Sequence, residues 1–138
     1  MKISANLKLM RKEWYSAFYA LNIEQLDYLE ADWFISTNGV KLMYKNGQLK
    51  KLSGLRRENQ LAFARYKRTE SNLHIRELGN LASISGVALI SAPEGDKCIH
   101  FMESWIKLQS SWKLQLQAFE DVNDSIIATS RLICDLES

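Results

Sequence analysis

Apolar side chains recur three or four residues apart near the start of the chain. This spacing places them on one face and predicts a helix over residues 4–21. Asn22 is suited to cap a second, short helix, which ends at Asp32. The apolar face of the first helix consists of Leu7, Met10, Trp14, Ala17, Phe18 and Leu21.

Two short runs of strand-forming residues flank the pair Asn38-Gly39. The runs cover residues 33–37 and 40–44, and an Asn-Gly pair between two such runs is typical of a β-hairpin. Asn46 can then begin a third helix. We therefore expect helix, helix, hairpin and helix in the first half of the chain.

From about Gln60 the apolar positions alternate with polar ones, which indicates strands rather than helices. Short connections separate the runs, so we expect an antiparallel meander. A last helix is predicted over residues 123–137, where Ile126, Ile133 and Leu136 share a face. The order predicts an α+β fold whose early helices cover one face of a curved sheet. The expected strands lie at 73–76, 81–91, 99–108 and 112–119.

The composition is that of a globular domain. The chain has 138 residues, of which 46% are apolar and 25% charged, so we expect one domain over residues 1–138. Charged residues interrupt every apolar run before it reaches the length of a membrane span. Two cysteines, Cys98 and Cys134, do not form a disulfide scaffold. We expect a cytoplasmic protein.

Positive charge is concentrated in one segment, residues 41–68. It holds nine basic residues and one acidic residue, whereas the whole chain has a net charge of +2. Such a segment could attract an acidic protein or nucleic acid. The aromatic residues of the segment, Tyr44, Phe63 and Tyr66, do not alternate regularly with its basic residues. This pattern favours a solvated surface and argues against nucleic acid as a partner.

Four stretches, which together cover about residues 5–120, stand out by their order and spacing. They are Ala20-Leu21-Asn22 with Leu26-Asp27-x-Leu29, Glu30-Ala31-Asp32-Trp33-Phe34, Gly79-Asn80-Leu81-Ala82-Ser83-Ile84-Ser85-Gly86, and Glu103-Ser104-Trp105-Ile106-Lys107 with Trp112. They resemble the helix link, acidic-aromatic strand entry, Gly-led turn and tryptophan hairpin of the nuclear transport factor 2-like superfamily. Within it, the similarity is to the SnoaL-like and ketosteroid-isomerase-like bacterial members.

The resemblance implies a specific architecture. It is a cone-shaped half-barrel, in which a strongly bent antiparallel sheet packs on the N-terminal helices and encloses an apolar pocket. It also implies a homodimer formed through the sheet. The C-terminal helix, residues 123–137, goes beyond the family pattern and is an addition to it. The expected pocket residues are Trp14, Phe18, Trp33, Ile35, Thr37, His100, Met102, Trp105 and Trp112.

The sequence offers few groups for catalysis. In the isomerase branch an acidic base stands on the first strand, and that position falls at or near Thr37, which cannot abstract a proton as a carboxylate would. The chain lacks the spacing of a metal site, so we expect neither a metal nor a cofactor. The remaining candidates for acid or base are His74, His100, Tyr15 and Tyr19.

Three functions therefore remain open. The favoured one is a homodimeric domain that binds an unidentified small molecule in an apolar pocket without acting as an enzyme. The first alternative is an enzyme of the cyclase, isomerase or dehydratase type that uses a cavity histidine or tyrosine. The second is an interaction module that docks a protein or nucleic acid through the basic segment 41–68.

Overall fold

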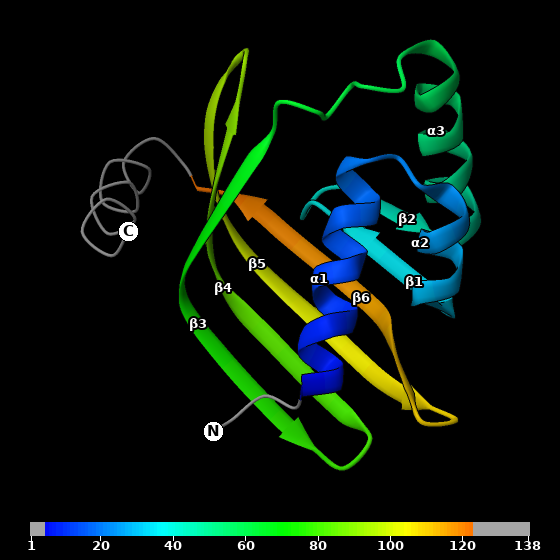
Figure 1. Cartoon of the computed structure of the whole chain (residues 1–138). Coiled ribbons are helices and arrows are strands. Elements are labelled where there is room, and N and C mark those ends of the chain that lie inside the picture. Colours follow the sequence, from blue (N-terminus) through cyan, green and yellow to red (C-terminus); the bar gives the residue numbers. More distant parts are fainter. Residues whose placement is uncertain (1–4, 123–138) are drawn as a thin grey trace.

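Three helices and six strands make up the computed structural model, which describes residues 5–122 (Figure 1). The helices are α1 (Ala5–Tyr19), α2 (Ile23–Leu29) and α3 (Lys45–Glu58), close to their predicted positions. The Asn22 side chain accepts a hydrogen bond from the backbone N–H of Gln25, which confirms the predicted cap. The strands are β1 (Glu30–Thr37), β2 (Leu42–Tyr44), β3 (Lys67–Leu78), β4 (Leu81–Ala92), β5 (Gly95–Leu108) and β6 (Ser111–Asp121).

The strands form one mixed sheet in the order β2-β1-β6-β5-β4-β3. The β1–β2 hairpin and the β3–β6 meander are antiparallel, as predicted. The prediction of a wholly antiparallel sheet is wrong, because β1 and β6 pair in parallel. Alternating residues do not determine this pairing. It depends on where α3 and its connection return the chain to the sheet.

The sheet twists but does not curl strongly, so the prediction of a strongly bent, cone-shaped half-barrel is also wrong (Figure 1). Register shifts occur between Ser71 and His74 and between Ser104 and Trp105. Such shifts bend the strand that carries them, but they do not by themselves roll a whole sheet. At the first shift β3 approaches Gly86 of β4, where an added Cβ would lie 2.9 Å from the Ser71 carbonyl oxygen.

The hydrophobic core lies between α1 and the face of the sheet that α1 crosses, here called the inner face (Figure 1). The opposite face is called the outer face. The predicted C-terminal helix over 123–137 lies outside the described residues. Within residues 5–122, no helix is long and apolar enough to cross a membrane. The largest fully buried side chains of the core are Trp14, Phe34, Trp105 and Trp112.

Candidate functional site

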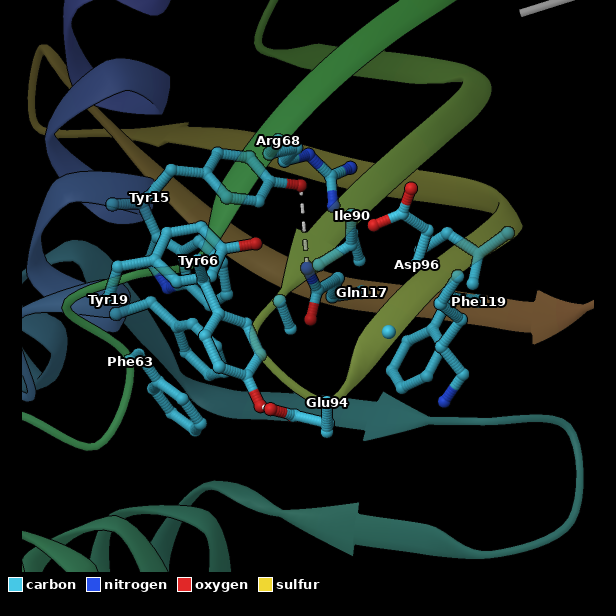
Figure 2. Close-up of a pocket in the computed structure, with 16 residues that line it drawn as sticks. Tyr15, Tyr19, Phe63, Tyr66, Arg68, Ile90, Glu94, Asp96, Gln117 and Phe119 are labelled. Atoms are coloured by element: carbon cyan, nitrogen blue, oxygen red, sulfur yellow. Dashed lines mark hydrogen bonds between the residues drawn. The ribbon is translucent and has the colours of Figure 1, made fainter. Parts of the chain in front are cut away.

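A pocket of about 610 Å³, here called the aromatic pocket, opens beside α1 over the inner face of the sheet (Figure 2). Trp14, Phe18 and Phe63 form a continuous stack along it. Their ring centroids are 5.3 Å and 5.5 Å apart, and the rings lie within 16° of parallel. Tyr19 and Tyr66 extend this aromatic wall. Its remaining lining includes Ile90, Ala92, Ile99 and Phe119 from β4, β5 and β6.

A second pocket, of about 670 Å³, lies on the other side of a shared wall. It is more basic than the first, since Lys8, Arg11 and Lys12 line it. We call it the basic pocket. The wall between the two pockets consists of Tyr15, Tyr19, Tyr66 and Arg68, which line both.

Behind this wall lies a fully buried carboxylate, Glu103 of β5. Arg11 donates to it from Nε and Nη2, each at 2.8 Å, and the Tyr15 hydroxyl donates at 2.5 Å. Arg11 and Tyr15 are four residues apart on α1, so both side chains point the same way. The Trp105 indole adds a third donor at 3.0 Å. These donors compensate the cost of burying the charge.

Glu70 of β3 joins Arg11 to a second arginine. Arg11 donates to both of its carboxylate oxygens, at 2.9 Å and 2.6 Å, and Arg68 Nε donates at 2.8 Å. Although burial favours the neutral acid, these hydrogen bonds hold the pKa of Glu70 below its usual value. Burial and the nearby Glu103 carboxylate raise the pKa of Tyr15, so its hydroxyl stays protonated at neutral pH.

A different buried acid, Glu30, lies at the start of β1. One of its oxygens accepts hydrogen bonds from the Trp14 indole and the Gln48 amide, both at 2.9 Å. Desolvation raises its pKa from 4.5 to about 7, even though these donors and Lys45 act in the opposite direction. Lys45 donates to backbone carbonyls at Asp27 and Glu30 and ties α3 to this corner.

Four of the residues singled out from the sequence line the aromatic pocket. They are Trp14, Tyr15, Phe18 and Tyr19, all on α1. Trp14 and Phe18 lie in the ring stack, and Tyr15 belongs to the network around Glu103. Trp14 and Phe18 belong to the predicted apolar face of α1, whereas Tyr15 and Tyr19 lie beside that face.

Five other expected pocket residues lie on the outer face and do not line the aromatic pocket. Phe34, Phe101 and Phe119 face the core, and side chains alternate along a strand, so their neighbours face outward. Three of the outward residues line a shallow depression of about 310 Å³ there instead. The expectation is corrected for Trp33, Ile35, Thr37, His100 and Met102.

The last two expected pocket residues, Trp105 and Trp112, are buried in the core and line neither of the two large pockets. His74 is exposed on β3, opposite Ser85, and His100 is exposed on β5, opposite Val87. Since both histidines point away from the inner face, neither can serve as an acid or base in the aromatic pocket.

Sequence reasoning missed the residues that carry most of the polar contacts. Arg11 lies outside the apolar face of α1, and nothing in the sequence sets Arg68 apart from the other residues of the basic segment. Glu103 did carry a signal. It occupies an inward position between Phe101 and Trp105, where a charged residue needs a buried partner.

The basic segment is not a single charged surface. Lys45 is buried against backbone carbonyls, and Arg68 is held by Glu70. Arg56 pairs with Glu24 at 3.1 Å. Over residues 5–122, no group of three or more histidine, cysteine or acidic side chains is arranged to hold a metal ion.

No protein-family model matches this sequence, and no curated protein sequence does so either. Solved structures do match the fold. An NTF2-like protein from Cytophaga hutchinsonii superposes with a TM-score of 0.70 at 14% identity, covering 88% of this chain and 100% of that one. The chain has the nuclear transport factor 2-like fold.

Two further structures similar to this NTF2-like chain carry functional names. A proposed ketosteroid isomerase from Shewanella frigidimarina has a TM-score of 0.68 at 13% identity, covering 84% of this chain and 95% of that one. A proposed dehydratase of the NTF2-like family from Streptomyces avermitilis has a TM-score of 0.65 at 13% identity, covering 85% and 94%. At such identities the likeness establishes the fold, and a fold alone does not assign a reaction.

Proposed function

We propose that this NTF2-like chain binds a small, flat aromatic molecule in the aromatic pocket and does not convert it chemically. The observation that carries the proposal is the stacked wall of Trp14, Phe18 and Phe63 along a pocket of about 610 Å³. Ligand sites typically span about 300–1,000 Å³ and combine apolar walls with a few polar groups.

The polar groups near the pocket support binding rather than catalysis. The Tyr15 hydroxyl donates a hydrogen bond to Glu103, and its raised pKa makes it a poor base or acid near neutral pH. Glu103 is itself buried behind the wall and held by Arg11. The network therefore acts as a rigid wall of the pocket.

The proposal can be tested with N-phenyl-1-naphthylamine, a neutral aromatic dye that fluoresces in apolar surroundings. Ala92 lines the pocket at the end of β4, so Ala92→Trp would fill part of it. We expect the dye to bind the unsubstituted chain and to lose at least about tenfold in affinity with Ala92→Trp.

Ala20→Trp is the matched control, because Ala20 is exposed at the end of α1 and lines neither large pocket. Its dye affinity should equal that of the unsubstituted chain. Absence of dye binding, or equal binding by the two tryptophan variants, would refute the proposal.

We also propose that the chain forms a homodimer through the outer face. Trp33 and Met102 are large apolar side chains on this face, 54% and 43% exposed, and a second copy would cover them. Met102→Lys should lower the mass measured by light scattering from dimer to monomer. Thr69→Lys, near the outer edge of the same face, should leave the dimer intact, and a monomeric unsubstituted chain would contradict the proposal.

A further inference from the structure

We infer that the ligand of the aromatic pocket is an organic acid whose carboxylate pairs with Arg68. This inference rests on the proposed binding function and adds the chemical class of the ligand. It starts from the position of Arg68 in the wall shared by both pockets, where its side chain is only 9% exposed. A charge buried to this extent is stable when acceptors pair with it.

The pairing of Arg68 inside the protein is incomplete. Its Nε donates to Glu70, but Glu70 also receives two hydrogen bonds from Arg11. Among the residues that the structure describes, none accepts a hydrogen bond from Arg68 Nη2, although this nitrogen is buried. A buried donor without an acceptor is costly, so the protein's own groups compensate the Arg68 guanidinium only in part, and this side chain lines the aromatic pocket.

The guanidinium is already oriented before a ligand arrives. Its central carbon lies 4.5 Å from the centroid of the Tyr15 ring and 4.7 Å from that of the Phe101 ring. Figure 2 shows it beside Tyr15 and above Ile90 at the edge of the aromatic pocket. A planar fork held in this way matches a carboxylate and loses little entropy on binding.

The charges around the wall favour a negative ligand group. Within the network, Arg11 and Arg68 balance Glu70 and Glu103. Lys8 and Lys12 then add two positive charges on the side of the basic pocket.

Two acids at the mouth of the aromatic pocket, Glu94 and Asp96, oppose this effect, but both are exposed. Water and salt screen exposed charges much more than buried ones. Each also accepts a hydrogen bond at the surface, Glu94 from the Tyr66 hydroxyl and Asp96 from the Ser91 hydroxyl. Among the charged side chains that line the aromatic pocket, Arg68 is therefore the one that solvent screens least.

The test compares two competitors of nearly equal shape, 2-naphthoate and 2-naphthamide, as they displace the dye N-phenyl-1-naphthylamine. At neutral pH the first is an anion and the second is neutral. We expect naphthoate to displace the dye at a concentration at least about tenfold lower than naphthamide.

Arg68→Met should remove this preference, measured as the ratio of the concentrations at which the two competitors displace the dye from the same variant. Glu70 keeps its two hydrogen bonds from Arg11 in this variant, so no acid is left unpaired. Arg65→Met, at an exposed arginine that lines neither pocket, is the control and should keep the full preference.

The outcomes separate this inference from the binding function on which it rests. If the dye binds, and Ala92→Trp blocks it, but both competitors act equally, the organic acid is overturned and the binding function stands. If the dye does not bind, both fail. Should Arg68→Met not fold, Arg68→Lys serves instead, because it keeps the charge and loses the planar fork. An unchanged preference in Arg68→Lys would overturn the pairing with the guanidinium.

Discussion

Two buried carboxylates, on two sides of α1, are held in different ways. Glu103, on the meander side, accepts hydrogen bonds from the charged guanidinium of Arg11. Glu30, on the side of β1 and α3, accepts hydrogen bonds from two neutral groups, the Trp14 indole and the Gln48 amide. Both acids are almost fully buried, so they differ in the charge of the groups that donate to them and not in their exposure to solvent.

The difference in donors leaves oxygen atoms near Glu30 without a hydrogen-bond partner among residues 5–122. Within the described residues, Glu30 Oε1 and Gln48 Oε1 are buried without a hydrogen-bond partner. Two acceptors without a donor agree with the raised pKa of Glu30, because a protonated carboxyl supplies an O–H. The meander side thus holds an ion network beside the pockets, and the α3 side holds an acid that can take up a proton.

The largest expected effect is at the ion network. Glu103→Ala leaves the Tyr15 hydroxyl and the Trp105 indole without their acceptor and removes one of two acids from Arg11. We expect the free energy of unfolding to fall by about 3–5 kcal/mol in urea denaturation. Glu58→Ala, at an exposed position at the end of α3, should leave it within about 0.5 kcal/mol.

The second effect concerns the pH dependence of stability. Between pH 4.5 and about 7, the folded chain keeps the Glu30 proton that the unfolded chain has lost. Stability from this group is therefore complete below pH 4.5 and falls as the pH rises towards 7. Glu30→Gln should remove this loss, which amounts to at most about 3 kcal/mol.

Denaturation of both chains at several pH values checks this prediction. At pH 8 the Glu30→Gln chain should be the more stable of the two, and the difference should shrink towards acidic pH. Parallel stability curves for the two chains would show that Glu30 does not titrate in this window.

The smallest effect compares a glycine from each side of the molecule. Gly86→Ala would place a Cβ 2.9 Å from the Ser71 carbonyl oxygen, so β3 must shift and stability should fall by about 1–3 kcal/mol. Gly54→Ala in α3 meets only a side-chain nitrogen of Arg57, at 3.9 Å. It should stabilise the chain by about 0.5–1 kcal/mol, and similar changes at both glycines would contradict the strained approach at Gly86.

Most of the secondary structure could be predicted because its signals are local. The face of α1, the Asn22 cap and the Asn38-Gly39 hairpin depend on residues a few positions apart. The same holds for the alternation along β4 and β5. The family resemblance then placed these elements in the correct fold.

Less of the site follows from local signals. Trp14 and Phe18, on the predicted apolar face of α1, both line the aromatic pocket. Tyr15 and Tyr19 line it too, although the sequence indicated them only as candidates for acid or base. The outward orientation of Trp33, Thr37 and His100 depends on which face of each strand meets α1. A period of two identifies two faces but does not say which one is buried.

By itself, the sequence determined where helices, strands and turns form, since backbone preferences and apolar periodicity act over short distances. The tertiary structure alone decided that β1 runs parallel to β6 and that the sheet stays open. It also brought Arg11, Arg68 and Glu103 together from three distant elements. Burial makes their charges depend on one another, and such contacts form only when the whole chain has packed.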